Sequence, residues 1–444
     1  MKHYDVLVIG GGPAGSLAAA GVLKAMPDAV VGIVDPDLDD NHRIGEALLT
    51  GTVMSLQDAG LDQLVAGAGF HHKIGASYVW GESREPWYVN YPRTFGDGYS
   101  EHFKDADGFR RSIHVARDRF DPLIRREMEK RGAVLVRSRL RGVKVTDTPL
   151  GPAVVSVTTD DGQVLTAKRY IDASGHSHVL GRHVTKRVPV GAARIARYAY
   201  TRSIDWDKAS RKGFDIHRTN IVSNEIGWFW AIHLGEAGRG MTSLGFVSTP
   251  DVLSKITMDN CTDMFPQLSD FGIASGYPEP LTFDGKPTSS FYGHPDYSFA
   301  CESLHGVNWS LAGDAAMFID PILSQGVTLA AHYGFSRGLA AARELQGDAC
   351  AQGEVTEHYR REGAILRLVV GEWYSNNRAA GDWRMKSVML SRDIYGQDLD
   401  EASAFRWITN LENLRHDYDP YPEEERRNIW RNLGVARGAV EQTA

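Results

Sequence analysis

A glycine-rich turn after the first apolar run constrains the fold more than any other feature of the chain. Residues 1–9 predict a short buried strand, and Gly10, Gly12 and Gly15 then fit the G-x-G-x-x-G spacing of a dinucleotide-binding turn. The first glycine permits the tight turn, the second lets the backbone approach a pyrophosphate, and the third lets a helix lie close to the strand. We therefore expect a dinucleotide to contact Gly10, Gly12, Pro13, Ala14 and Gly15.

An acidic residue at the end of the next predicted strand supports this interpretation. Residues 30–34 form an apolar run that ends at Asp35, twenty residues after Gly15. A carboxylate there can accept hydrogen bonds from a ribose hydroxyl, which favours an adenosine without a 2′-phosphate. Because NAD and FAD enzymes share this unit, the turn alone does not choose between the two cofactors.

Composition excludes several classes of function. Lys plus Arg number 49 and Asp plus Glu number 56, so the formal net charge is −7, and no dense basic run offers a nucleic-acid surface. No apolar run approaches the ~20 residues of a membrane span, and no leader precedes the first strand. Three scattered cysteines predict neither a disulfide framework nor a metal site. We expect a cytoplasmic protein without nucleic-acid, membrane or metal partners.

Two later strand ends carry charged residues that can reach a cofactor. A predicted strand at 112–116 is followed by Arg117, whose guanidinium fork suits a phosphate, and by a helix that begins near Asp118. A surface arginine at a strand end is the simpler alternative. A further strand at 164–171 leads into Asp172, in a turn that we expect beside the first sheet.

The third segment of this kind is the most specific. A predicted strand at 307–312 precedes Gly313 and Asp314, and the carboxylate can bind the hydroxyls of a cofactor sugar. The turn that follows opens a long helix of small residues, and its backbone N–H groups can hold the electron-rich pyrimidine edge of a flavin. The turn residues expected at this edge are Pro321, Ser324 and Gly326.

Together these segments resemble the FAD-binding fold of class A flavoprotein monooxygenases, from residue 1 to about Gly338. Within that superfamily the chain is similar to the flavin-dependent halogenases and their halogenase-like monooxygenase relatives. The resemblance implies an α/β fold, with an FAD-binding Rossmann-like domain of the PHBH/GR2 type and an antiparallel-sheet substrate domain. Four stretches carry the narrower similarity, the last with the F-x-x-P-x-x-S-x-G pattern: residues 44–48 with Glu46 at the cofactor, residues 72–76 with Lys73, residues 228–232, and residues 318–326.

The resemblance implies that reduced FAD reacts with O2 to give a C4a-hydroperoxide, from which two outcomes diverge. Direct oxygen transfer hydroxylates an electron-rich ring of the indole, tryptophan or phenol type. Attack by halide gives hypohalous acid instead, which Lys73 then activates for halogenation. Trp228 and Trp230 share one face of a predicted strand and would wall the reaction site. Ordinary core tryptophans and a solvated lysine are the simpler alternatives.

Two departures from the halogenase pattern favour hydroxylation. The pattern W-x-W-x-I-P ends here in His233, which restores a backbone N–H and adds a titratable imidazole. Near Glu46, Ala47 and Thr50 replace the usual serine and proline. We therefore predict an FAD-dependent monooxygenase that hydroxylates an aromatic ring, with a halogenase as the alternative. The predicted catalytic residues are Lys73, Trp228, Trp230 and His233.

The predicted architecture has three parts. Residues 1–190 and 300–340 form a discontinuous FAD-binding domain, 190–300 a substrate-side β-sheet domain, and 341–444 a helical C-terminal region. No second dinucleotide fingerprint follows residue 35, which is compatible with a separate flavin reductase. Related one-component enzymes bind NAD(P)H without such a motif, so that source of electrons stays open.

The expected substrate is a flat aromatic ring, free or carried on a peptide or protein. His114 and His233 are candidate acid/base groups. Two further alternatives stay open: a reductase of the same fold that saturates a prenyl chain, and a flavin-binding maturation partner without turnover. The aromatic residues expected to line the pocket are Phe103, Trp228, Trp230, Phe291, Tyr292 and Phe318.

Overall fold

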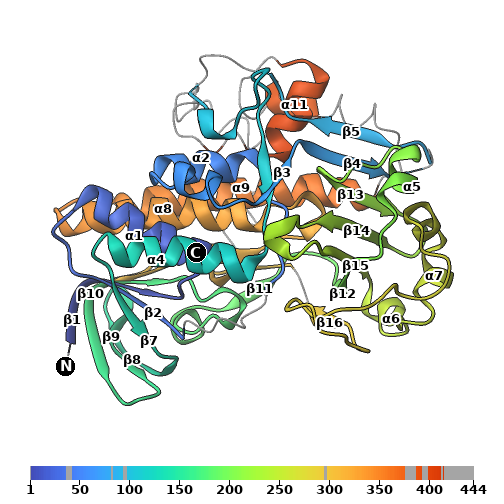
Figure 1. Cartoon of the computed structure of the whole chain (residues 1–444). Coiled ribbons are helices and arrows are strands. Elements are labelled where there is room, and N and C mark those ends of the chain that lie inside the picture. Colours follow the sequence, from blue (N-terminus) through green and yellow to red (C-terminus); the bar gives the residue numbers. More distant parts are fainter. Residues whose placement is uncertain are drawn as a thin grey trace.

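Two large sheets form the molecule, with long helices packed over the first of them and reaching towards the second (Figure 1). The computed structural model describes residues 2–36, 43–81, 84–93, 98–294, 298–375, 387–392, 399–411 and 414. The predicted helical region 341–444 therefore lies partly outside the described residues.

The first sheet contains the predicted dinucleotide unit. Its strands run in the order β7-β2-β1-β10-β9-β8, with β18 paired to β10. Strands β7, β2, β1, β10 and β18 pair in parallel, whereas β8, β9 and the start of β10 pair antiparallel. This arrangement confirms the predicted α/β fold class. The strands are β1 (Lys2–Ile9), β2 (Val31–Asp35), β7 (Val134–Arg137), β8 (Leu140–Thr148), β9 (Gly151–Thr159), β10 (Val164–Asp172) and β18 (Trp309–Leu311).

Two helices lie in direct contact over this sheet, α1 (Pro13–Ala25) and α8 (Gly326–Leu345). A Cβ atom at Gly334 would lie 2.2 Å from Ala14 O, and one at Gly338 would lie 2.0 Å from Ala18 O, so only glycine lets the backbones approach this closely. Because these pairs advance together along both helices, α1 and α8 run in the same direction. Their N-termini therefore open on the same side of the sheet.

The second sheet runs in the order β16-β12-β15-β14-β13-β4-β5. Strands β12 to β16 lie within residues 190–300, where the sequence predicts a β-sheet domain. Strands β4 and β5, however, come from the N-terminal part of the chain, and β4 pairs in parallel with β13. The predicted boundary at residue 190 therefore does not enclose the whole sheet, and the domain limits stay a proposal. The strands are β4 (Gly75–Val79), β5 (Trp87–Asn90), β12 (Ile195–Thr201), β13 (Arg218–Ser223), β14 (Trp228–His233), β15 (Thr242–Ser248) and β16 (Tyr292–His294).

A small two-stranded sheet holds Lys73. It consists of β3 (His71–Lys73) and β6 (Ser112–His114), and Lys73 lies opposite Ser112 in the antiparallel register. A single bridge between Ala47 and His114 attaches this sheet to the segment that carries Glu46. Immediately after β6, α4 (Arg117–Lys130) begins at Arg117.

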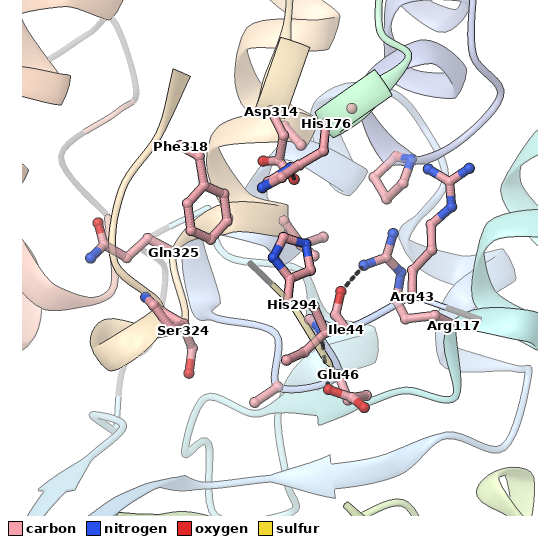
Figure 2. A pocket seen from close by; sticks show the side chains of 18 of the residues that line it. Arg43, Ile44, Glu46, Arg117, His176, His294, Asp314, Phe318, Ser324 and Gln325 are labelled. Atoms are coloured by element: carbon pink, nitrogen blue, oxygen red, sulfur yellow. Dashed lines mark hydrogen bonds and ion pairs between the residues drawn. The ribbon is translucent and has the colours of Figure 1, made fainter. Parts of the chain in front are cut away.

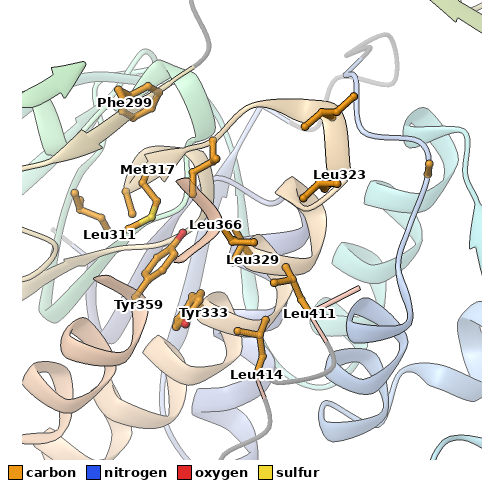
Figure 3. Close-up of a cluster of buried hydrophobic side chains, with 14 of the residues drawn as sticks. Phe299, Leu311, Met317, Leu323, Leu329, Tyr333, Tyr359, Leu366, Leu411 and Leu414 are labelled. Atoms are coloured by element: carbon orange, nitrogen blue, oxygen red, sulfur yellow. The ribbon is translucent and has the colours of Figure 1, made fainter. Parts of the chain in front are cut away.

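A buried core between helices α8 and α9 connects the C-terminal region to the turn that carries Asp314. Helix α9 (Ala351–Ser375) packs on α8, and the rings of Tyr333 and Tyr359 stack with centroids 3.6 Å apart (Figure 3). The Tyr359 hydroxyl donates to Gly313 O at 3.3 Å, which supports the turn before Asp314. The shorter α11 (Glu401–Thr409) follows in the described part of the region.

Candidate active site

A cavity of about 610 Å³ lies between the two sheets, at the N-termini of α1 and α8. Its volume falls within the ~300–1,000 Å³ that is typical of ligand pockets. The predicted site residues that line it are Gly12, Pro13, Ala14, Glu46, Arg117, Trp228, Trp230, Asp314, Pro321, Ser324 and Gly326. The predicted site residues that lie outside its lining are Gly10, Gly15, Asp35, Lys73, Asp172, His233 and Gly313.

The three fingerprint glycines divide into two kinds. Gly10 has a φ of 100°, and a Cβ there would lie 2.4 Å from Ala173 O; a Cβ at Gly15 would lie 1.8 Å from Gly10 O. These two glycines serve the packing of the protein itself. At Gly12 the closest protein atom to an added Cβ is Asp121 Oδ2, at 3.6 Å, yet the residue lines the cavity. Space at Gly12 is therefore left for something other than protein, as a dinucleotide requires.

Charged residues surround the first turn. Asp35 accepts the Gly11 N–H at 2.7 Å and lies 3.6 Å from Arg125, so its carboxylate stabilises the glycine turn. Arg117 makes two hydrogen bonds to Asp121, at 2.7 and 2.8 Å, and donates to Ile44 O at 2.8 Å. Because Asp121 engages two of its nitrogens, the Arg117 guanidinium is held rigidly on the cavity wall.

The Asp172 side chain does not line the cavity but binds backbone N–H groups next to it. Its carboxylate accepts the N–H groups of Ser174, Leu180 and Gly181 at 2.8–3.0 Å. These hydrogen bonds fold the turn that places residues 173–177 on the cavity wall. In the same wall, His176 Nδ1 lies 3.5 Å from Asp314 Oδ2.

The turn before α8 presents backbone N–H groups to the cavity. Asp320 caps it by accepting the Ile322 N–H at 3.0 Å, and Ser324 takes a left-handed conformation with a φ of 58°. Helix α8 then begins at Gly326 and continues for 20 residues. The free N–H groups and the positive dipole end of this long helix make the turn suitable for an electron-rich group.

The second sheet forms the opposite wall. Trp228, Trp230 and Ile232 alternate along β14 and all line the cavity. The indole N–H of Trp230 donates to Ser243 Oγ at 3.0 Å, and that of Trp228 donates to the Tyr374 hydroxyl at 2.8 Å. Of the six aromatic residues predicted at the pocket, Phe103 and Phe291 lie in the packed core outside the lining.

Glu46 is a buried carboxyl on the cavity wall, only 2% exposed. It accepts the Tyr200 hydroxyl at 2.9 Å and the Gly45 N–H at 3.1 Å. Burial raises the pKa of Glu46 above its ordinary value, although these hydrogen bonds and Arg117 act in the opposite direction.

Lys73 is buried in an unusual state for a lysine, because the side chain is only 1% exposed and its amine is unpaired. Within the part of the chain that the structure describes, its amine has no hydrogen-bond or ion-pair partner. Burial lowers the pKa of Lys73 to about 7. Burial, and after it the charge of Lys73, lowers the pKa of His114, whose Nε2 lies 3.4 Å from Thr219 Oγ1 on the cavity wall. Lys73 is therefore near the cavity without lining it.

His233 belongs to a cluster of imidazoles on the far face of β14. Its ring lies 5.0 Å from that of His71, which stacks on His217 at 4.6 Å. The His233 carbonyl accepts His114 Nδ1–H at 2.9 Å, and burial lowers the pKa of the His233 ring to about 4. The His233 imidazole is not among the residues that line the cavity.

Several cavity residues had no motif to indicate them. Figure 2 shows Arg43 beside Arg117 on one side, His176 beside Asp314, and His294 facing the same space. Arg43 directly precedes the recognised segment 44–48 and is half-buried, so it is a natural anion contact. The remaining residues come from tertiary contacts: Tyr198, Thr219, Ile221, Phe283, Tyr292 and Gln325.

The described residues contain neither a membrane-spanning helix nor a metal-binding cluster. Among them, no helix combines the length and apolar character needed to cross a membrane. No group of three or more His, Cys, Asp or Glu side chains in that same part of the chain is arranged to hold a metal ion.

Comparison with known proteins gives one family and many relatives. The model of the tryptophan halogenase family matches residues 5–106 and 99–380. A tryptophan 2-halogenase of Chondromyces crocatus is 25% identical over 387 residues, which span 84% of this chain and 68% of the relative. A 1H-pyrrole-2-carbonyl–peptidyl-carrier-protein chlorinase of Pseudomonas fluorescens is 27% identical over 368 residues, spanning 78% and 75%. A flavin-dependent halogenase of Armillaria mellea is 27% identical and spans 79% and 66%.

Solved structures show the same fold. The flavin-dependent brominase Bmp2 superposes with a TM-score of 0.72 at 21% identity, covering 98% of this chain and 100% of that one. The myxobacterial chondrochloren halogenase CndH gives a TM-score of 0.70 at 24% identity, covering 96% and 99%. At these identities the likeness establishes the fold alone.

Proposed function

The chain belongs to the tryptophan halogenase family, and from that membership we propose that it is a flavin-dependent halogenase of an electron-rich aromatic ring. The observation that carries the proposal is the unpaired, buried amine of Lys73, with its pKa lowered to about 7. A lysine in this state is suited to chemistry rather than to stability, because a structural lysine would have a partner or reach solvent.

The prediction of hydroxylation is wrong. The relatives are named halogenases, chlorinases or brominases, among them a tryptophan 2-halogenase and enzymes of a carrier-bound pyrrole. The reason for the error lies at His233, whose departure from the halogenase pattern favoured oxygen transfer. That ring lies on the face of β14 opposite to the one that lines the cavity, so its presence is no sign of a changed cavity wall.

The cavity residues fit FAD, the cofactor of flavin-dependent halogenases, which use it with O2 and halide. Gly12 leaves space for a pyrophosphate, Arg43 and Arg117 supply positive charge beside it, and Asp314 supplies a carboxylate for sugar hydroxyls. The N–H groups at Ser324–Gly326 suit the pyrimidine edge of the flavin. When bound and reduced, FAD supplies with O2 the oxidising equivalents that convert halide into hypohalous acid.

Lys73 then directs the hypohalous acid. A pKa of about 7 leaves both forms of the amine populated at neutral pH. The ammonium can donate a hydrogen bond to the oxygen of hypohalous acid; the neutral amine can instead take the halogen, releasing water and forming an N–X bond. On the first route the ring carbon takes the halogen from hypohalous acid, and the ring proton leaves with the hydroxyl oxygen as water. On the second route the ring carbon takes the halogen from the nitrogen, and the ring proton restores the amine.

The walls favour an aromatic substrate. Trp228, Trp230, Tyr198 and Tyr292 provide flat apolar surface on the second sheet. We propose an indole, phenol or pyrrole ring, free or carried on a peptide or protein, as the carrier-bound substrates of two relatives suggest. A separate flavin reductase is the proposed source of electrons.

The test is mass spectrometry of products made with a flavin reductase, O2 and bromide or chloride. The panel contains free indole, phenol and pyrrole substrates and a carrier-bound pyrrole. We expect halide-dependent replacement of one ring hydrogen, lost in Lys73→Ala at unchanged FAD content. Lys104→Ala is the matched control, since Lys104 is also buried but pairs with Glu101 at 2.7 Å. Halide-independent addition of oxygen would contradict the proposal.

A further inference from the structure

Three side chains from distant parts of the sequence form a hydrogen-bonded chain at the cavity. Trp228 Nε1–H donates to the Tyr374 hydroxyl oxygen at 2.8 Å, and the Tyr374 hydroxyl donates to Asp320 Oδ1 at 2.9 Å. Trp228 lies on β14, Asp320 in the turn before α8, and Tyr374 in the last turn of α9. One phenol therefore connects the second sheet, the flavin-side turn and the C-terminal helical region.

Chemistry fixes the direction of both hydrogen bonds. An indole N–H can only donate, so the Tyr374 oxygen must accept from Trp228. Burial raises the pKa of Tyr374 well above 10, so its hydroxyl keeps the proton that it donates to Asp320. Asp320 Oδ1 receives the Ile322 N–H as well, at 3.0 Å. The same carboxylate oxygen thus caps the turn and holds the phenol.

The phenol is fixed on its ring faces as well as at its hydroxyl. The guanidinium carbon of Arg194 lies 3.4 Å from the centroid of the Tyr374 ring, and the Trp80 ring meets it edge-on at 5.8 Å. A cation–π contact at this distance restrains the ring plane. Arg194 also opposes the burial that raises the pKa of the nearby Asp320 to about 6.

Both ends of this hydrogen-bonded series, Trp228 and the segment around Asp320, lie at the cavity. Trp228 lines it directly, and Ile319 and Pro321, on either side of Asp320, line it as well. We propose that Tyr374 is a positioning residue that holds Trp228 at a fixed distance from the flavin-side turn. The inference rests on the proposed function, because it assigns the α9 end a role in directing oxidising equivalents to the ring. Misplacement of catalytic walls by ~1 Å can cost about a hundredfold in rate.

The test compares Tyr374→Phe with Tyr333→Phe in FAD-loaded enzyme. Tyr333 is a matched control, since its buried hydroxyl also makes one hydrogen bond, to His358 Nδ1 at 2.8 Å, but lies off the cavity. Three quantities are measured: the FAD dissociation constant, brominated product per O2 consumed, and the Trp228 indole N–H resonance in protein labelled with ¹⁵N-tryptophan and assigned with Trp228→Phe.

We expect Tyr374→Phe to keep FAD affinity within about twofold, to lower product per O2 about tenfold, and to shift the Trp228 resonance. Asp320→Asn keeps the acceptor oxygen and should preserve product per O2, whereas Asp320→Ala should not. If Tyr374→Phe gives the same amount of brominated product per O2 as Tyr333→Phe, the inference is overturned. If the wild-type enzyme brominates no ring, the proposed function fails, and an unmoved Trp228 resonance still overturns the hydrogen-bonded chain.

Discussion

Replacement of Lys73 by methionine should make the protein more stable and inactive at once. The amine is 1% exposed and lacks a partner among the described residues, so folding must strip it of water without compensation. Methionine has a similar length, carries no charge and adapts to irregular space. Lys73→Met therefore removes a cost of folding together with the amine that we propose directs hypohalous acid.

The size of the gain follows from the titration of the amine. Burial lowers the pKa of Lys73 from 10.5 to about 7. Between these values the unfolded chain holds a proton that the folded chain has released, so the free energy of unfolding of the wild type rises with pH across this window. At about 1.36 kcal/mol per pH unit the full window corresponds to about 5 kcal/mol, and about 3 kcal/mol applies at pH 8. The advantage of Lys73→Met should therefore be largest at pH 7 and disappear near pH 10.5.

The assay is urea unfolding of FAD-saturated wild type and Lys73→Met at pH 7, 8 and 9.5. We expect a higher midpoint for the variant, with an excess that shrinks as pH rises, and no brominated product. Lys104→Met is the control, because its amine is paired with Glu101 and its loss should bring no gain. A lower midpoint for Lys73→Met, or an excess independent of pH, would refute the buried, unpaired amine.

Two further pairs of substitutions test the glycine turn and the surroundings of Lys73. Gly12→Val should abolish FAD binding but leave the melting temperature of the apoprotein unchanged, because the nearest protein atom to an added Cβ is 3.6 Å away; Gly15→Val should lower that temperature, because its Cβ would meet Gly10 O at 1.8 Å. Flavin absorbance and thermal melting separate the two. Ser112 lies opposite Lys73, and its buried Oγ has no partner among the described residues. Ser112→Asp should raise the pKa of Lys73 and lower bromination about tenfold at constant FAD content, whereas Ser112→Ala should not.

The cofactor side of the fold could be predicted because its signals are local. The glycine turn and Pro13 at the start of α1 directly follow β1, and the helix that opens at Gly326 directly follows the turn at Pro321–Leu323. Backbone geometry at such junctions depends on the residues present, and the structure confirms the α/β class that they indicate.

Partners supplied by other segments could not be predicted. Asp35 and Asp172 stand at strand ends as expected, but their carboxylates bind backbone N–H groups, of Gly11 in one case and of Leu180 and Gly181 in the other. Tyr374 has no motif at all, and it meets Trp228 and Asp320 from the end of α9, which packs on α8. Spacing gives the position of a side chain, whereas its hydrogen-bond partners depend on the tertiary fold.

The orientation of His233, unlike the partners of Asp35, Asp172 and Tyr374, could be predicted, because side chains alternate between the two faces of a strand. Trp228, Trp230 and Ile232 occupy the cavity face of β14, and alternation places His233 with Phe229 and Ala231 on the other face. A proline or a histidine at 233 therefore changes the neighbourhood of His71 and leaves the cavity wall as it is. A departure from the halogenase pattern at position 233 is therefore no sign of hydroxylation. Under the proposed function, the Lys73 amine rather than this imidazole directs the hypohalous acid.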